Sequence, residues 1–303
     1  MAQNVLLTGG SGFIGKHLTD VLIEAGFSVS VLSRSDKENN ARVTFYKWDL
    51  NKNYIDENAV LNADYVIHLA GEGIVDKKWT EKRKKAIIES RTKPIDLIFS
   101  VLEKHNKKLE AFVSASAVGI YGAITNHKIC KESDPPANDF LGTVCQKWEN
   151  AVDKFEYLNI RTATIRTGIV LGKDEGFLKK ITPSFKSGFG SILGSGKQYV
   201  PWIHIEDLCR IYLKSIQDSR LKGPYNACIT DNTTNSRLSK IIAKIYGYAI
   251  WLPKVPDFVL KILLGEMCIV ILTGQRVSSE KIQQTGFEFY YTDLEKTLIS
   301  CLK

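Results

Sequence analysis

The chain has 303 residues, of which 44% are hydrophobic and 24% are charged, and its formal net charge is +8. This composition is typical of a globular protein and excludes disordered, collagen-like and coiled-coil chains. The positive charge suits an anionic ligand, but the basic stretch DKKWTEKRKK at 76–85 has the spacing of a solvated helix face, so we predict no nucleic-acid surface.

The six cysteines are scattered without a CxxC pair, which argues against a zinc site and a disulfide framework and fits a reducing, cytoplasmic setting. The histidines are not grouped with carboxylates or cysteines, so no metal is expected. MAQN leads directly into an apolar strand, which predicts no secretory signal. The most hydrophobic stretch, 258–274, is interrupted by Lys261, Gly265 and Glu266. We therefore expect two buried helical pieces there and no membrane span.

Short, β-branched segments alternate with helical stretches up to about residue 170. Strands are predicted at 5–9, 28–34, 43–48, 65–71, 111–116 and 162–168, and helices at 15–26, 79–106 and 139–158. This alternation indicates an α/β protein with a Rossmann-type doubly wound parallel sheet. We expect residues 1–170 with about 201–230 to form the nucleotide-binding domain. Residues 171–200 and 231–303 would then form a smaller, mainly helical C-terminal substrate-side domain.

The first predicted strand ends in the glycine-rich sequence VLLTGGSGFIG. Gly9, Gly12 and Gly15 follow the strand and open the first helix, where the pyrophosphate of a dinucleotide binds backbone N–H groups and the helix dipole. The alternative is a tight strand-to-helix turn without a ligand. The position at the start of a βαβ unit favours a cofactor.

Ser33 and Arg34 stand at the end of the second predicted strand, where an acidic residue would bind the ribose 2′-hydroxyl of NAD. A guanidinium pairs with a 2′-phosphate, so the sequence predicts NADP(H). The alternative is an exposed loop arginine. Asp49, after the third strand, is a candidate contact to the adenine amino group or simply a turn aspartate.

Several motifs in order carry a family resemblance: TGGSGFIG, WDL at 48–50, HLAG at 68–71, SASAVGIYG and the tail LLGEMCIVILTGQRVSSEKIQQTGF. With LAGEGIVDKKWTEKRKKAIIESR, CQKWENAV, RTGIVLG and GSGKQYVPWIHIEDL, they resemble the YfcH-like epimerase-family proteins, an atypical subgroup of the extended short-chain dehydrogenase/reductases. The resemblance covers nearly the whole chain. It implies a C-terminal substrate-side domain, an unresolved substrate and, by analogy, a possible homodimer.

The resemblance also implies contacts to the cofactor at four places: the phosphate loop, the 2′-phosphate, the strand end beneath the nicotinamide, and the loop beside the nicotinamide. The corresponding residues are Gly9, Gly12, Phe13 and Ile14; Ser33 and Arg34; Leu69, Ala70 and Gly71, with Arg91 near the cofactor; and Val170 in the loop 168–170.

Active members of the broader superfamily carry a Tyr-x-x-x-Lys pair on the helix after the serine strand. In this chain, alignment on Glu149 places Leu141 and Cys145 at those positions, and another register gives Thr143 and Lys147. The pair works because residues four apart share one helix face and a cation lowers the pKa of a nearby phenol. The motif is absent from this helix.

Ser116 and Tyr121, in VSASAVGIYG, are the candidate catalytic residues. Ser116 aligns with the superfamily serine if one residue is inserted at Gly119, and it stands at the carboxyl end of a predicted parallel strand. The alternative is a serine satisfied by backbone groups. Tyr121 can supply the missing phenol, or it can be a packing residue in a Tyr-Gly turn.

Three polar residues beyond the sheet are further candidates. His204 is expected to be a hydrogen-bonded core histidine, and Lys197 and Gln198 either meet an anionic or sugar substrate or lie in a solvated loop. Two functions stay open. One is an NADP(H)-dependent oxidoreductase or epimerase-like enzyme acting on a small, possibly nucleotide-sugar-like molecule, and the other is an NADP(H)-binding sensor or scaffold without turnover.

Overall fold

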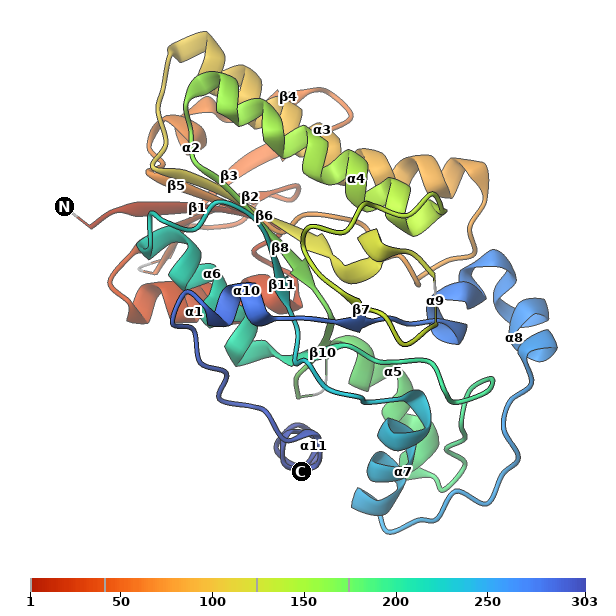
Figure 1. The fold of residues 1–303 in the computed structure, drawn as a ribbon. Helices are drawn as coiled ribbons and strands as arrows, with labels where there is room; N and C mark the ends of the chain where they lie inside the picture. The colour runs from red at the N-terminus through yellow and green to blue at the C-terminus, as the bar shows by residue number, and fades with distance from the viewer. Residues whose placement is uncertain (1, 41, 124, 174) are drawn as a thin grey trace.

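The computed structural model describes residues 2–40, 42–123, 125–173 and 175–303. Its centre is an eight-stranded sheet in the order β11-β8-β6-β5-β1-β2-β3-β4 (Figure 1). Every pairing is parallel except that of β3 with β4. The strands are β1 (Asn4–Thr8), β2 (Ser28–Ser33), β3 (Val43–Asp49), β4 (Tyr54–Ile55), β5 (Tyr65–His68), β6 (Ala111–Ala117), β8 (Thr162–Thr167) and β11 (Gly223–Ala227).

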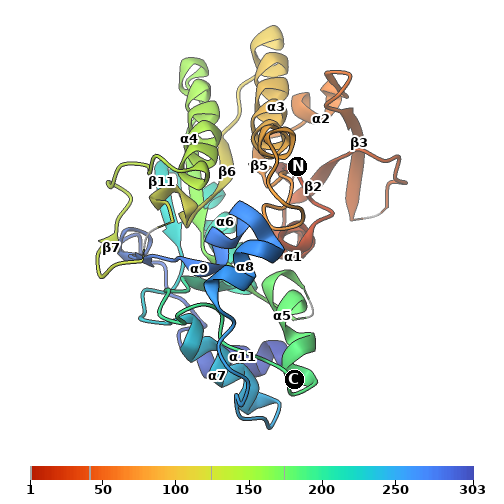
Figure 2. The same ribbon diagram turned by 90° about the vertical axis from the view of Figure 1, so that its right-hand side faces the viewer.

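Helices cover both faces of this sheet. On one face lie α2 (Glu57–Leu61), α3 (Glu81–His105) and α4 (Phe140–Asp153), which a 3-10 turn, η2 (Lys154–Leu158), continues. On the other lie α1 (Phe13–Glu24) and α6 (Ile205–Gln217), which contact each other (Figures 1 and 2). The predicted Rossmann-type doubly wound sheet is therefore confirmed.

The core of the sheet explains why these segments are strands. Leu6, Ile67 and Phe112 are fully buried between the helix layers, as expected for parallel strands that are covered on both faces. The ring of Phe112 stacks on Phe155 with 4.0 Å between centroids, which fixes η2 against β6.

The elements that carry a second cluster of buried side chains lie below the sheet in Figure 1, away from α3 and α4. A two-stranded parallel sheet of β9 (Ile169–Leu171) and β10 (Trp202–His204) packs there with α5 (Gly176–Lys186), α7 (Asn235–Ile245) and α11 (Leu294–Leu302). The remaining elements are η1 (Val118–Tyr121), β7 (Ile129–Cys130), α8 (Asp257–Leu264), η3 (Gly265–Cys268), α9 (Ile269–Leu272), β12 (Arg276–Val277) and α10 (Glu280–Gln283).

The stretch 258–274 departs from expectation. It is helical in two main pieces, α8 and α9, as predicted, but α8 is not buried: Phe258 and Ile262 are 64% and 72% exposed. Hydrophobicity alone cannot tell a buried helix from one whose apolar face meets solvent. Within the described part of the chain, no helix combines the length and the apolar character needed to cross a bilayer.

Ion pairs connect the C-terminal half to the loop and helix that follow β5. Lys84 of α3 pairs with Glu266 of η3 at 2.8 Å, and Lys180 of α5 pairs with Asp76 at 2.7 Å. Lys78 also donates to the Ile262 carbonyl at 3.4 Å. These contacts join segments far apart in the sequence across one side of the molecule, which faces the viewer in Figure 2.

Candidate functional site

The glycine-rich turn joins β1 to α1 in a geometry that only glycine permits. Gly9 has a φ of +71°, and a Cβ there would lie 2.9 Å from the Ala70 nitrogen. A Cβ on Gly15 would lie 2.4 Å from the Gly9 carbonyl oxygen. Gly12 is the N-cap of α1 and provides no side-chain cap. The N-cap residue therefore offers no side-chain acceptor to the first N–H groups of the helix, as a phosphate-binding helix start requires.

Phe13 and Ile14 occupy the first turn of α1. The Phe13 ring packs against Gly172, because a Cβ added at Gly172 would lie 2.5 Å from Cζ of the ring. The ring thus points away from the turn while the backbone stays at the helix start. This turn fits the phosphate groups of a dinucleotide.

Thr8 ties the carboxyl end of β1 to that of β5. Its hydroxyl lies 2.7 Å from Nδ1 of His68 and accepts the N–H groups of Leu69 and Ala70 at 3.2 and 3.1 Å. His68 is fully buried, and burial lowers its pKa to about 3. The strand end predicted to run beneath the nicotinamide therefore rests on a buried, neutral hydrogen-bond network.

Arg91 and Arg83 of α3 hold the loop that continues from this strand end. Arg91 donates to the Glu72 carbonyl at 3.0 Å, and Arg83 pairs with the Glu72 carboxylate and donates to the Gly73 carbonyl at 2.6 Å. Gly71 lies directly on Arg91, because a Cβ there would be 3.1 Å from the guanidinium carbon. The predicted residues Leu69, Ala70, Gly71 and Arg91 thus form one contiguous group.

Ser33 and Arg34 lie at the carboxyl end of β2, beside the turn, because β2 pairs with β1. Ser33 is buried and donates to the Ser35 carbonyl at 2.8 Å, whereas Arg34 is exposed. Asp49 ends β3 and accepts the N–H of Asn51 at 2.9 Å, so it does serve as a turn aspartate. Its adenine contact stays a prediction.

Ser116 ends β6 in a buried network. Its hydroxyl donates to Oε1 of Glu149, on α4, at 2.6 Å. Arg166 of β8 makes a bidentate pair with the same carboxylate, at 2.9 Å from Nε and 2.7 Å from Nη2. Burial opposes the charge of Arg166, but the ion pair outweighs it and raises the pKa of Arg166. Ser116 is thus bonded to a side chain, and not to the backbone groups that the alternative interpretation assumed.

Tyr121 ends η1 on the far side of Arg166. Its hydroxyl donates to Oδ1 of Asn226 at 2.7 Å and accepts from Arg166 at 3.1 Å. Burial is the main cause that raises the Tyr121 pKa well above its usual value. These contacts are those of a packed, hydrogen-bonded tyrosine and weigh against proton transfer. A catalytic role stays a prediction.

The helix face that carries the Tyr-x-x-x-Lys pair elsewhere in the superfamily is apolar here. A Cβ on Gly119 would lie 3.6 Å from Leu141 and 3.8 Å from the Cys145 sulfur, so both residues face η1. Cys145 is buried, and desolvation raises the pKa of its thiol to about 12. The thiol is therefore neutral and unreactive near neutral pH.

Val170 lies in β9, where it pairs with Ile203 of β10, so the loop predicted at 168–170 is partly a strand. His204 is half-buried, caps α6 by accepting the Glu206 N–H at 3.3 Å, and stacks on Tyr291. Burial lowers its pKa. It is hydrogen-bonded, as expected, but it lies at a helix start and not in the core.

The environment of Gln198 excludes one of the two interpretations given for it. The solvated-loop interpretation is wrong for this residue, because Gln198 is 2% exposed and donates to the carbonyls of Leu193 and Ile271 at 3.0 and 2.9 Å. Lys197 beside it is exposed. The amide of Gln198 therefore fastens the glycine-rich loop to α9, a role that polarity alone does not reveal.

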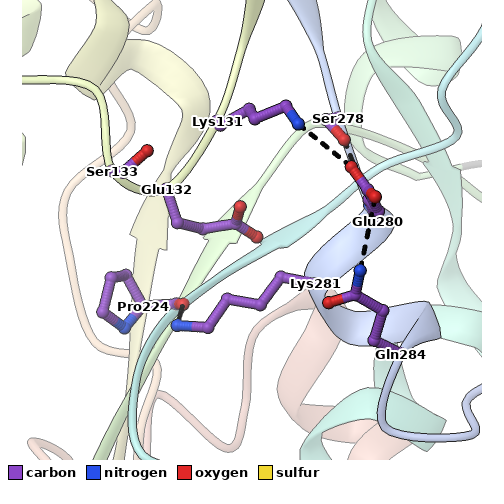
Figure 3. A pocket seen from close by; sticks show the side chains of 8 residues that line it. All are labelled: Lys131, Glu132, Ser133, Pro224, Ser278, Glu280, Lys281 and Gln284. Carbon is purple, nitrogen blue, oxygen red and sulfur yellow. Dashed lines mark hydrogen bonds and ion pairs between the residues drawn. The ribbon is translucent and has the colours of Figure 1, made fainter.

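A separate hollow of about 420 Å³ lies along the edge strand β11 (Figure 3). Its charged side chains bond to other protein groups: Lys131 pairs with Glu280 at 3.1 Å, and Lys281 donates to the Pro224 carbonyl at 2.7 Å. The lining comes from the segment after β7, from β11 and from the start of the α10 region, not from the elements around the glycine turn. We assign it no ligand.

Sequence reasoning missed several polar residues of the site, among them Thr8, Glu149, Arg166 and Asn226. Arg166 could have been found, because it is the one charged residue in the strand TATIRT. A charge in a buried strand indicates a buried partner of opposite charge. Thr8 and Asn226 could not have been found in this way, because nothing local to either residue indicates its partners.

The protein is a Rossmann-type, doubly wound α/β protein. Its mostly parallel sheet carries the glycine turn at the carboxyl end of β1, and the other residues described above lie around that turn. Comparison with known families gives a closer assignment. The profile of the NAD dependent epimerase/dehydratase family matches residues 5–228, and that of a domain of unknown function, DUF1731, matches residues 255–300. The chain belongs to the NAD dependent epimerase/dehydratase family, which confirms the resemblance seen in its motifs.

Relatives match over nearly the whole chain. The epimerase family protein YfhF of Bacillus subtilis is 34% identical over 98% of this chain and 97% of its own length. The chloroplastic SDR39U1 homolog of Arabidopsis thaliana is 35% identical over 98% of this chain and 86% of its own length. A crystal structure of human epimerase family protein SDR39U1 with NADPH has a TM-score of 0.85 at 25% identity and covers 99% of both chains.

A nucleoside-diphosphate sugar epimerase from Corynebacterium glutamicum is also similar in structure, with a TM-score of 0.79 and 28% identity over 99% of this chain and 58% of that one. Such similarity supports membership of the epimerase/dehydratase family. It leaves the reaction of this chain to be argued from its own residues.

Proposed function

We propose that the protein is an NADP(H)-dependent oxidoreductase or epimerase-like enzyme that acts on a small molecule of the nucleotide-sugar type. One observation carries the cofactor assignment: β2 ends in Ser33-Arg34, with an exposed guanidinium beside the glycine turn where NAD-specific sites place a carboxylate. The human relative crystallised with NADPH supports it.

The residues around the turn have separate tasks in this proposal. Gly9, Gly12 and the start of α1 bind the pyrophosphate, and Arg34 pairs with the 2′-phosphate. The loop from Leu69 to Gly71, supported by Thr8 and Arg91, forms the floor beneath the nicotinamide ribose. The cofactor supplies hydride exchange when bound.

Ser116 orients the substrate oxygen in this proposal. Its single proton is directed to Glu149, which leaves the lone pairs of its Oγ to accept a hydrogen bond from a substrate hydroxyl. We further propose that residues 171–200 and 231–303 form the substrate-side domain. The separate buried cluster of β9, β10, α5, α7 and α11 supports that division.

A sensor or scaffold without turnover is the second candidate, and a specific observation favours it. Leu141 and Cys145 replace the tyrosine and lysine that transfer the proton in active relatives, and the Tyr121 hydroxyl is bonded to Asn226 and Arg166. In this alternative the crevice binds NADP(H) and communicates its presence through the C-terminal segments.

Fluorescence titration with NADPH and NADH tests the cofactor assignment. We expect the wild type to bind NADPH at least about tenfold more tightly than NADH, and Arg34→Ala to remove most of that preference, since a charge-assisted pair with phosphate is lost. Arg42→Ala is the matched control, because Arg42 is also exposed but pairs with Asp20 at 2.9 Å. Equal affinities of the wild type for the two cofactors would refute the assignment.

An assay of turnover distinguishes the enzyme from the sensor or scaffold. The absorbance of reduced nicotinamide is followed while the protein, loaded with either NADP⁺ or NADPH, meets a panel of nucleotide sugars and their keto derivatives. For an enzyme, the absorbance changes or the sugar is epimerised, and Ser116→Ala abolishes either result and leaves NADPH affinity intact. Tight NADPH binding with no change in absorbance and no epimerised sugar for any compound supports the sensor.

A further inference from the structure

Arg91 is a buried cation that has no anionic partner among the residues the structure describes. It is 7% exposed, its Nη1 and Nη2 donate to the carbonyls of Ile87 and Glu72 at 2.8 and 3.0 Å, and its Nε has no hydrogen-bond partner in the described part of the chain. Among the described residues, no carboxylate forms a salt bridge with it. Burial lowers its pKa to about 10, so it stays protonated at neutral pH. Buried charges in proteins are normally paired, so this exception calls for an explanation.

Its neighbours do not cancel this charge. Arg83 pairs with Glu72, and Arg166 pairs with Glu149, so each of those pairs is neutral as a unit. The face of the Trp148 ring lies 4.9 Å from the Arg91 guanidinium carbon and stabilises the cation without adding a charge. One net positive charge therefore remains at this position.

The Arg91 guanidinium lies in the half of the crevice that is farther from the proposed 2′-phosphate site. Gly71, in the segment just after β5, lies directly on the guanidinium, with 3.1 Å from an added Cβ to Cζ. In doubly wound folds the adenosine half lies over the first strands, β1 and β2 here, and the other half lies across the switch point, over β5 and β6. On α4, the side chain that faces this region at the superfamily's lysine position is the neutral Cys145.

We propose that Arg91 makes the cofactor site selective for the reduced form, NADPH, over the oxidised form, NADP⁺. The inference rests on the proposed NADP(H) site and goes beyond it. The oxidised nicotinamide ring carries a positive charge and the reduced ring carries none, so an uncompensated cation beneath the ring repels only the oxidised form. One unit charge at a separation of about 10 Å in a partly hydrated site corresponds to about tenfold in affinity.

Calorimetric titration tests the proposal with three ligands: NADPH, NADP⁺ and adenosine 2′,5′-bisphosphate, which lacks the nicotinamide. We expect the wild type and Arg91→Lys to bind NADPH about tenfold more tightly than NADP⁺. Arg91→Met removes the charge, and the ratio of the two dissociation constants falls toward one. Affinity for the bisphosphate stays unchanged in every variant.

Arg91→Gln is a second neutral variant, which can still donate to the Glu72 carbonyl if the methionine variant does not fold. Arg161→Met is the matched control: Arg161 is also a partly buried arginine that donates to backbone carbonyls, of Ser215 and Leu221 at 2.8 Å, but it lies at the amino end of β8. Its loss leaves the ratio intact.

A wild-type ratio near one, or a ratio that neither neutral variant changes, overturns the proposal. Failure of the wild type to bind NADPH at all would instead refute the proposed function.

Discussion

At the scale of single residues, the crevice is held by buried polar side chains that bond to one another across different strands and helices. Glu149 shows the pattern, because its carboxylate accepts from Ser116 on β6 and from Arg166 on β8. A carboxylate in such a place is stable only while its cation stays. Each member of this group therefore has a larger effect on stability than an exposed polar residue has.

Arg166→Met should lower the free energy of unfolding by about 3–5 kcal/mol, because it leaves Glu149 buried and uncompensated. The double variant Arg166→Met/Glu149→Leu should recover about half of that loss, since both charges are removed together. Urea denaturation measures the two values. A double variant less stable than the single one would contradict this account.

His68 predicts a dependence of stability on pH. Its folded pKa, about 3, lies below the ordinary value of 6.5, because burial favours the neutral ring. The stability contributed by the neutral form is complete above the unfolded pKa and is lost as pH falls from that value toward the folded one. Between about pH 7 and pH 5 the loss should be about 2 kcal/mol.

Denaturation of wild type and His68→Gln at those two pH values measures this contribution. The variant does not titrate at this position, so its stability should fall by less than that of the wild type. Parallel pH profiles would show that His68 is not the responsible group.

At the scale of elements, α6 anchors the C-terminal tail. Asp207 is fully buried in the first turn of α6 and accepts the N–H groups of Tyr290 and Tyr291 at 3.0 Å. Arg210, one turn later, donates to Asp207 at 2.8 Å and lies over the Tyr290 ring. Two residues of one helix thus position the chain that leads into α11.

Asp207→Ala should destabilise the protein by about 3 kcal/mol, because two partly buried backbone donors and Arg210 lose the acceptor that the buried carboxylate provides. Limited proteolysis should then cleave near residues 288–292 before it cleaves the sheet. The control is Asp293→Ala, which removes only the cap that accepts the Lys296 N–H and should cost about 1 kcal/mol. Equal losses for the two variants would contradict the anchoring role.

Elements with a strong local pattern were predictable from the sequence, and elements that depend on distant partners were not. The predicted strand at 28–34 is β2, and the predicted helix at 79–106 is α3, because apolar periodicity identifies both. The edge strand β11, GPYNA, was not predicted, since glycine and proline disfavour strands and only its pairing with β8 makes it one.

The residues of the site also fall into a group that local sequence predicts and a group that it does not. The glycine turn and the residues after β2 follow from local sequence, because they depend on backbone geometry at a strand end. The partners of Ser116 and Tyr121 come from residues 33 and 105 positions away, and no local pattern specifies such contacts.

At the scale of the whole molecule, α8 presents three exposed apolar side chains, Phe258, Ile262 and Leu263, on one short helix. Phe258 and Ile262 lie on this helix, at 64% and 72% exposure, while Leu260 faces inward. Substituting Ile262 by lysine should change the free energy of unfolding by no more than about 0.5 kcal/mol. It should also raise solubility, which measurement of the saturation concentration tests. A large loss of stability would show that α8 packs on another surface.

The ion pairs Lys84–Glu266 and Lys180–Asp76 form a latch of surface side chains, of which only Lys84 is partly buried. Such pairs weaken as salt screens them, so added salt would loosen the contact between the C-terminal half and the loop and helix that follow β5. We expect the rate of NADPH release, followed by stopped-flow fluorescence, to rise with salt. Glu266→Gln should be faster at low salt and less sensitive to added salt than the wild type. With a latch of this kind, the ionic environment would control how fast the cofactor exchanges, and not only how tightly it binds.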